Sequence, residues 1–416
     1  MQSQGDVTGA FSLAIFPRAY NCAMTNPFQS QFLLDPSVAF LNHGSFGACP
    51  KSVFTAYRQW QIRLENQPVL LLGREHAQLD REARHALGRY LNVNGDDLAF
   101  VPNATHGVNI AARSLKLNPG DEVLTTDHEY GACNYAWEYA CQMSGARYVY
   151  QPVTYPAESG EQIFEQFWQG VTPRTRVIYL SHITSPTALR LPVEAICRKA
   201  RACGIITVID GAHAPGQIPL DLASFDPDFY TGNCHKWMLS PKGAGFLYVR
   251  RDMQKMVEPM IVSWGRHAEP KKSAGSQFLD DLTWTGTHDP SAYFSVPMAI
   301  EYLQANHWEE VRSACHDLLK TVLPRIRQIT GLPAAYPDES DLYSQMAACL
   351  LPPDTDIDVL KARLYDEYKV EVPLIEWNDL KLVRISVQCY NTPADLDRLV
   401  EALRVLLPQV VKVTGA

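Results

Sequence analysis

The sequence lacks the features that would direct it to a membrane or to nucleic acid. No apolar stretch reaches the roughly 18–20 residues that span a bilayer. Its 416 residues include 37 basic and 45 acidic side chains, which give a net charge of −8, and no basic run is present. We therefore expect neither a membrane nor nucleic acid as a partner. A hydrophobic content of 46% and a charged content of 20% are typical of a soluble globular protein.

Cysteine is present, but not in the arrangements that form disulfide frameworks or metal sites. The ten cysteines include no C-x-x-C pair and no cluster with histidine. This scatter favours reduced thiols in a cytoplasmic enzyme and predicts no metal site. Cys234, inside the stretch FYTGNCHKW, is interpreted as a small packing residue rather than a nucleophile.

The N-terminal 23 residues have neither a basic leading region nor an apolar core long enough for a signal peptide. Met24 offers a second possible start, and we interpret residues 1–36 as an N-terminal extension. The remaining length suits a large domain followed by a smaller one, which we predict at 37–290 and 291–416.

Helical and strand patterns alternate between residues 50 and 250. Helical spacing of apolar residues covers 51–66 and 76–92, and β-prone runs lie at 97–101, 122–125, 148–150, 176–180, 205–209, 228–232 and 245–249. The runs at 176–180 and 205–209 are almost continuously apolar, as expected for strands covered on both faces. The alternation predicts an α/β fold with a mostly parallel sheet between helices.

The pattern changes near residue 290. Two long helices are predicted at 291–306 and 307–329, followed by strands at 346–351 and 383–387 and helices at 357–368 and 393–407. This order predicts a smaller α+β domain at the C-terminal end.

Polar or aromatic residues follow the carboxyl ends of five predicted strands, the edge at which open α/β sheets bind ligands. They are Thr105, Tyr130, the pair Thr184 and Ser185, the pair Asp210 and His213, and Lys236. Thr105 opens a helix whose N-terminus can bind phosphate, although alone it could be a simple cap. The five strand ends together predict one ligand site.

The chemistry of this site fits pyridoxal phosphate. The ligand needs a phosphate site, an aromatic residue such as Tyr130 to stack on its ring, an acid such as Asp210 for its ring nitrogen, and an amine such as Lys236 for its carbonyl. Asp210 would keep the pyridine protonated, so that the ring can accept electrons from Cα. Lys236, once displaced by substrate, would move the Cα proton.

Several longer stretches resemble one enzyme family. They are LLDPSVAFLNHGSFG, TTDHEYGA, SHITSPTALRLP, VIDGAHAPGQIPLDL, FYTGNCHKW, SWG, TGTHDPSA and RISVQCYNT, and they run from about residue 33 to about residue 392. The chain is similar in these stretches to class V of the fold-type I pyridoxal-phosphate enzymes, and within it to the isopenicillin N epimerase family. The resemblance implies a large cofactor-binding domain on a mostly parallel, seven-stranded sheet and a smaller α+β domain.

The resemblance also implies a role for each site residue. Lys236 would bind the cofactor covalently, Asp210 would pair with its ring nitrogen, His213 would contact its phenolic oxygen, and Tyr130 would stack on its ring. The phosphate would be held by Ala104, Thr105 and His235, with Ser185 also at the cofactor, and Gly286 and Thr287 would reach it from the second subunit of a homodimer. Arg384 would clamp the substrate carboxylate, and the loop Asn42, His43, Gly44 and Ser45 would close over it.

The implied reaction is exchange of the Cα proton with inversion, on an amino acid or a peptide-like molecule that ends in one. Inversion needs a second proton donor, for which Tyr130 is the candidate. A carbon–sulfur lyase, an aminotransferase and a cofactor-binding protein without turnover stay open as alternatives. The stretch YKVEVPLIEWNDLKLVRIS contains no cysteine, which disfavours a desulfurase that forms a persulfide.

Overall fold

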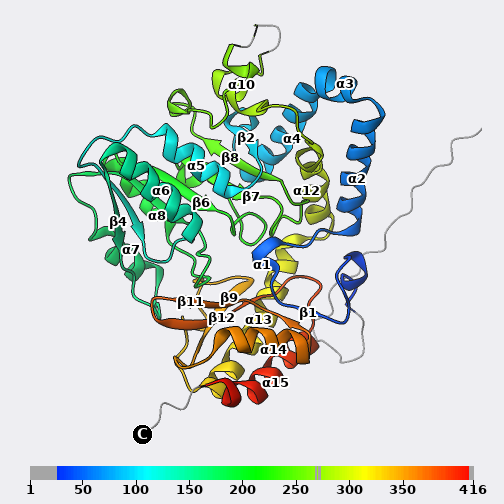
Figure 1. Ribbon diagram of the computed structural model, residues 1–416, viewed down its shortest axis with the longest axis vertical. Helices are drawn as coiled ribbons and strands as arrows, with labels where there is room; N and C mark the ends of the chain where they lie inside the picture. The colour runs from blue at the N-terminus through cyan, green and yellow to red at the C-terminus, as the bar shows by residue number, and fades with distance from the viewer. Residues whose placement is uncertain (1–25, 268, 270–272, 412–416) are drawn as a thin grey trace, which may run out of the picture.

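The computed structural model describes residues 26–267, 269 and 273–411. The possible start at Met24 lies outside the described residues. The molecule has two parts stacked along its longest axis, a larger α/β part and a smaller part below it (Figure 1). Within the described residues, no helix combines the length and the apolar character needed to cross a membrane.

A seven-stranded sheet with the order β2-β8-β7-β6-β5-β3-β4 forms the centre of the larger part. Its strands are β2 (Leu98–Val101), β3 (Glu122–Thr126), β4 (Arg147–Gln151), β5 (Thr175–Ser181), β6 (Ile206–Gly211), β7 (Phe229–Asn233) and β8 (Gly245–Val249). Only β8 runs antiparallel to its neighbours β2 and β7. The predicted α/β fold with a mostly parallel sheet is thus confirmed.

Helices surround this sheet, as the buried strands require. They are α2 (Lys51–Asn66), α3 (Pro68–Leu70), α4 (His76–Leu91), α5 (Ala104–Ser114), α6 (Gly131–Ser144), α7 (Gly160–Trp168), α8 (Val193–Ala202), α9 (Leu222–Phe225), α10 (Gln277–Thr283), α11 (Ser291–Phe294) and α12 (Val296–Ala305). The single helix predicted at 291–306 is two helices, because the chain leaves α11 at Ser295 and α12 restarts with Pro297 in its first turn. Side chains of Asn103 and Ser159 cap the starts of α5 and α7.

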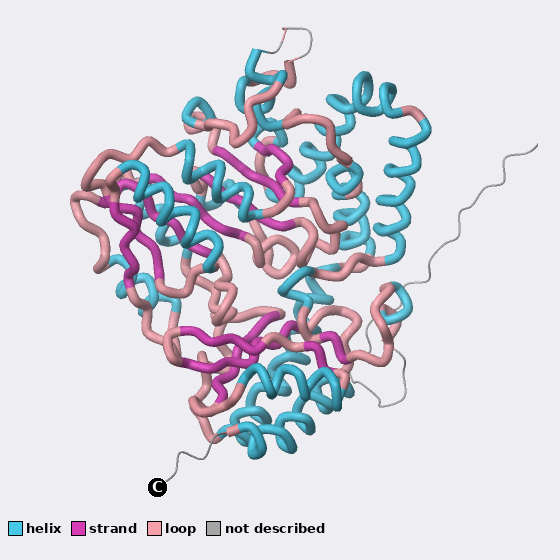
Figure 2. The backbone as a smooth tube through the Cα atoms, in the orientation of Figure 1, coloured by secondary structure: helices cyan, strands magenta, loops and turns pink. Residues whose placement is uncertain are grey.

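The smaller part is a three-stranded antiparallel sheet, with helices below it in Figures 1 and 2. Its strands are β9 (Met346–Leu351), β11 (Leu374–Trp377) and β12 (Leu380–Ser386), and its helices are α13 (Trp308–Thr330), α14 (Ile357–Tyr368) and α15 (Pro393–Val410). The predicted border at residue 290 stays a prediction, and α11 and α12 pack against α2 and α4 of the larger part.

The N-terminal segment ties the two parts together. Its strand β1 (Ala39–Phe40) pairs in parallel with β10 (Val370–Glu371) of the smaller part. The short helix α1 (His43–Phe46) follows and lies between the two parts (Figure 1). Gly47 then has a φ of +71°, and a Cβ atom there would stand 2.1 Å from the carbonyl oxygen of His235. Only glycine lets this loop touch the backbone beside Lys236.

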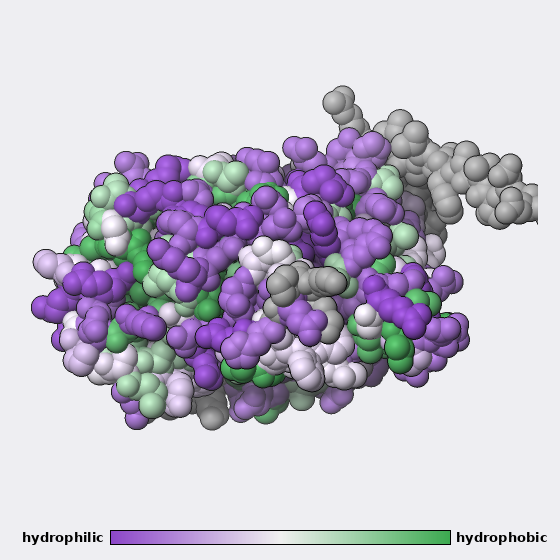
Figure 3. Space-filling model, turned by 90° about the horizontal axis from the view of Figure 1, so that it is seen from above, coloured by the Kyte–Doolittle hydropathy of each residue, from purple (hydrophilic) through white to green (hydrophobic). Residues whose placement is uncertain are grey.

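The outer surface is largely hydrophilic, with scattered hydrophobic residues, in the face shown in Figure 3. Among the residues that the structure describes, no three histidine, cysteine, aspartate or glutamate side chains are placed so that they could bind a metal ion together.

Candidate active site

A pocket of about 340 Å³ opens where the carboxyl ends of β5, β6 and β7 face the smaller part. The strands contribute Ser181, Asp210 and Asn233, and the remaining lining comes from the loops beyond them, from the start of α5, from the α1 segment and from β12. The site therefore forms at the strand edge that the sequence predicted, closed by one strand of the smaller part.

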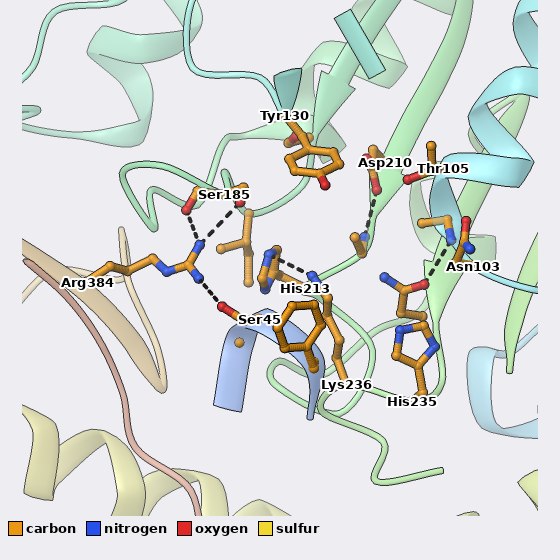
Figure 4. A pocket seen from close by; sticks show the side chains of 17 residues that line it. Ser45, Asn103, Thr105, Tyr130, Ser185, Asp210, His213, His235, Lys236 and Arg384 are labelled. Carbon is orange, nitrogen blue, oxygen red and sulfur yellow. Dashed lines mark hydrogen bonds between the residues drawn. The ribbon is translucent and has the colours of Figure 1, made fainter. Parts of the chain in front are cut away.

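Lys236 lies at the centre of this pocket (Figure 4). Its Nζ atom is 3.2 Å from Nε2 of His213. Burial and, after it, the positive charge of Arg384 together lower the pKa of Lys236 to about 7, while Asp210 and Cys133 act in the opposite direction. At neutral pH a large fraction of this lysine is therefore an uncharged, nucleophilic amine.

Asp210 is the penultimate residue of β6, and its side chain is buried. One oxygen, Oδ1, accepts a hydrogen bond of 2.9 Å from the N–H of Ala212. The other, Oδ2, lies 3.5 Å from Sγ of Cys133 and 3.4 Å from the hydroxyl of Tyr179. Burial raises the pKa of this carboxyl, whereas the Ala212 N–H and Lys236 lower it. A cationic partner in the pocket would favour its charged form.

One end of the pocket is formed by the start of helix α5 and by His235. Ala104 and Thr105 begin α5, whose N-terminus carries a partial positive charge. The Ala104 N–H donates to Oδ1 of Asn233 at 2.8 Å, which fixes the helix to the end of β7. His235 lines the same end, and its Nδ1 is 3.0 Å from the carbonyl oxygen of Ala244.

Arg384, on β12, occupies the opposite end (Figure 4). One terminal nitrogen donates to the Ser185 carbonyl and lies 3.2 Å from its hydroxyl, and the other lies 3.2 Å from the Ser45 hydroxyl. Its Nε atom is buried with no hydrogen-bond partner among the described residues. Burial lowers the pKa of Arg384 to about 10, so the guanidinium stays charged at neutral pH.

The loop predicted to close over a substrate contributes only half of its residues. Gly44 and Ser45 line the pocket. Asn42 instead donates to Glu371 at 3.1 Å, and the buried ring of His43 lies between Tyr390 and the backbone oxygen of Lys236, at 2.9 and 3.1 Å. His43 thus braces the lysine from behind.

The remaining predicted residues are split between the pocket and its surroundings. Tyr130, at the start of α6, lines the pocket and is half-exposed. Thr184 is buried against Thr187, with a hydroxyl contact of 2.7 Å, and does not line the pocket. Gly286 and Thr287 lie after α10, outside the lining of their own chain's pocket.

Sequence reasoning did not assign several lining or supporting residues. They are Asn103, Ser181, Ile183, Ala212, Asn233 and Phe46 in the lining, and Trp237, Cys133 and Tyr179 behind it. Asn103 could have been predicted, because an asparagine just before the first residues of a helix is a strong N-cap signal. The apolar and aromatic residues in this set give no signal of this kind in the sequence. Only their positions in the folded structure distinguish them from ordinary core residues.

Comparison with known proteins shows the class. The family Aminotransferase class-V matches residues 48–399, and the chain belongs to this family. Enzymes of this class use pyridoxal phosphate. The pocket fits that cofactor, since it joins the Lys236 amine, the buried carboxyl of Asp210, and a helix N-terminus for a phosphate.

Individual relatives carry several activities. The chain is 35% identical to isopenicillin N epimerase of Amycolatopsis lactamdurans, over 91% of this chain and 97% of that protein. It is 27% identical to a probable chloroplastic L-cysteine desulfhydrase of Arabidopsis thaliana, over 92% and 85% of the two proteins. A structure of a C-DES mutant, in which glycine is linked covalently to pyridoxal phosphate, is similar in fold, with a TM-score of 0.79, 22% identity, and coverage of 91% and 99%.

Proposed function

We propose that the protein binds pyridoxal phosphate at Lys236 and uses it to remove and replace the Cα proton of an amino acid, or of a peptide-like molecule that ends in one, with inversion. The observation that carries this proposal is the pairing of two groups in one pocket. One is an amine with a pKa lowered to about 7, and the other is the buried Arg384 with an unpaired Nε. A protein that only stores the cofactor needs no such carboxylate site.

Bound pyridoxal phosphate supplies a ring that accepts the electrons left at Cα when the proton departs. The chain supplies the other functions. Asp210 keeps the ring nitrogen protonated, Arg384 holds the substrate carboxylate through a bidentate contact, and Lys236 takes and returns the proton at Cα. Ser45 and Ser185, which already contact Arg384, orient its guanidinium.

The phosphate end is proposed to hold the cofactor by charge and by hydrogen bonds. Ala104 and Thr105 offer the N-terminus of α5, and His235 stands beside them. Tyr130 covers the cofactor ring from the side of the pocket opposite Lys236 (Figure 4). Its hydroxyl is our candidate for the second proton donor, because inversion requires donors on both faces of Cα.

The likeness to an epimerase at 35% identity supports inversion. A carbon–sulfur lyase is the second candidate, supported by the likeness to an L-cysteine desulfhydrase. Both reactions begin with removal of the same proton, and an aminotransferase shares this step as well. The residues around Lys236 can support all three reactions, so the products formed from the substrate must be measured to distinguish them.

The deciding experiment is incubation in deuterated water with a panel of amino acids and short peptides. Deuterium at Cα together with both enantiomers is the expected result. Stoichiometric ketoacid with the amine form of the cofactor would replace the proposal by an aminotransferase. Sulfide, pyruvate or ammonia would replace it by a lyase.

We also propose a homodimer with shared active sites. Gly286 and Thr287 do not line their own pocket, which leaves them free to complete a second one. Trp264, at 85% exposure, and Val262, at 71%, are large apolar side chains that a partner would cover. Sedimentation should give a dimer at micromolar concentration, and a fully active monomer loaded with cofactor would contradict the proposal.

A further inference from the structure

Three side chains form a continuous series of polar contacts that leads from Trp237, behind the pocket, to His213 and Lys236 in its lining. The indole Nε1 of Trp237 is 3.3 Å from Nδ1 of His213, and Nε2 of His213 is 3.2 Å from Nζ of Lys236. Trp237 and His213 are both buried, so water has little access to either contact. Trp237 follows Lys236 directly in the sequence, yet its side chain reaches the histidine from the opposite side of the imidazole ring.

The donor at one end decides the hydrogen-bonding role of the ring. An indole N–H can only donate, so Nδ1 of His213 must be the acceptor and can carry no proton. The one proton of the neutral imidazole therefore lies on Nε2, which faces Lys236. Burial, and then the charges of Lys236, Arg384 and His43, hold the pKa of His213 well below its usual value, so a second proton on the ring is disfavoured.

We propose that Trp237 is a positioning residue that fixes His213 in the neutral tautomer with its proton on Nε2, so that His213 presents a hydrogen-bond donor and not an acceptor to Lys236 and to the occupant of the pocket. Its part in catalysis rests on the proposed function, but the tautomer itself does not.

The fixed tautomer favours one protonation state of Lys236. A neutral amine has a lone pair that can accept from the Nε2–H of His213. An ammonium has only donors, so its N–H would face the Nε2–H of His213 at a nitrogen–nitrogen distance of 3.2 Å, with no acceptor between the two donors. The groups that also act on Lys236 are Arg384, which disfavours the ammonium, and Asp210 and Cys133, which favour it. The histidine thus adds to burial in keeping the amine free to react.

The indole that sets the tautomer is itself held in place. Trp237 packs on the ring of His43 with a centroid distance of 4.9 Å. Nε2 of His43 is 3.1 Å from the Lys236 carbonyl oxygen, and a carbonyl can only accept. The backbone of Trp237 also meets Gly216 so closely that a Cβ there would stand 2.3 Å from it. These contacts leave the indole little freedom to turn away.

Replacing Trp237 by phenylalanine keeps an aromatic ring and removes the N–H. His213 could then adopt the other tautomer, with its proton on Nδ1. The lone pair on Nε2 would face Lys236 and would stabilise its ammonium form. Exchange of this one hydrogen bond should raise the pKa of Lys236 by about one unit. The matched control is Trp137→Phe, because Trp137 is a buried tryptophan that does not line the pocket and whose Nε1 has no partner within the described chain; its ring packs on Tyr179 with a centroid distance of 5.7 Å.

The test uses the full-length protein freed of cofactor. Capture of Lys236 by added pyridoxal phosphate is followed by absorbance across pH, then fixed with borohydride and mapped by mass spectrometry. We expect a midpoint near 7 in the unchanged protein and in Trp137→Phe, and a midpoint about one unit higher in Trp237→Phe. An unshifted midpoint in folded Trp237→Phe would overturn the proposal.

A second measurement covers the case in which Trp237→Phe does not fold. Long-range proton–nitrogen NMR on the unchanged protein, with His213→Gln used only to assign the signals, reads which nitrogen of His213 carries the proton. A proton on Nε2 supports the proposal, and a proton on Nδ1 overturns it. Neither readout needs turnover, so absence of Cα exchange would refute the proposed function and leave this inference standing.

Discussion

Two histidines flank Lys236 in one pocket and have opposite hydrogen-bonding roles. His213 meets a donor, the Trp237 indole, and so turns an N–H toward the pocket. His235 meets an acceptor, the Ala244 carbonyl, so its Nδ1 carries the proton and Nε2 keeps a lone pair. The difference teaches that the residue type does not decide what a histidine offers to a ligand. The hydrogen-bond partner of the ring nitrogen that points away from the ligand decides whether the other nitrogen donates or accepts.

The two histidines should therefore respond differently to an anion. His213 already donates and needs no change in protonation. Burial lowers the pKa of His235 to about 4, so at neutral pH it is an uncharged ring with an acceptor beside the α5 N-terminus. A bound phosphate has no proton to share with that lone pair when it is fully ionised, so His235 must take up a proton before it can donate.

Lys236→Ala should have the largest effect, and it separates movement of the Cα proton from retention of the cofactor. Turnover should fall by on the order of 10⁴-fold, since the group that moves the Cα proton is gone. Cofactor should still bind without a covalent bond, because the phosphate end is intact. Turnover and cofactor retained after gel filtration measure the two effects. Lys242→Ala is the control, as Lys242 contacts the Gly47 carbonyl at 2.9 Å outside the lining. Borohydride fixation on Lys242 instead would refute the assignment.

A smaller effect is expected from His235→Ala, compared with His213→Ala. Affinity for inorganic phosphate, measured by calorimetry near neutral pH, should fall about 3- to 10-fold in His235→Ala, the range for one neutral hydrogen bond, because phosphate at this pH keeps an O–H that the lone pair of His235 can accept. His213→Ala should leave phosphate affinity within a factor of about two, since His213 faces Lys236 and not the α5 N-terminus. Equal losses in both variants would mean that the two histidines do not serve different ends.

The smallest effect is proton uptake on anion binding. A bound sulfate should raise the pKa of His235 above its value of about 4, so binding takes up a proton wherever the pH lies between the two values. Sulfate affinity should therefore weaken as pH rises through the upper value. Calorimetry at pH 6 in two buffers of different ionisation enthalpy should give uptake of up to about one proton. His235→Ala should show none, and equal uptake in that variant would assign the proton to another group.

Strong local patterns made much of the fold predictable. The boundaries of α2, α14, β8 and β9 agree with the sequence patterns to the residue, since the two helices show helical spacing of apolar residues and the two strands are short, nearly continuous apolar runs. The strand pair β1 and β10 was not predicted, because two-residue strands have no periodicity to detect. The break at Ser295 was also missed, although Pro297 signals it.

The sequence by itself determined the chemistry of the pocket. Lys236, Asp210, Thr105 and the other polar residues follow strand ends, and parallel strands bring their carboxyl ends to one edge. Tertiary structure decided what each group offers there. Whether His43 lines the pocket or braces the lysine, and whether His213 donates or accepts, depends on contacts with Tyr390 and Trp237. Such contacts form between atoms only a few ångströms apart in the fold, and no periodicity in the chain encodes them.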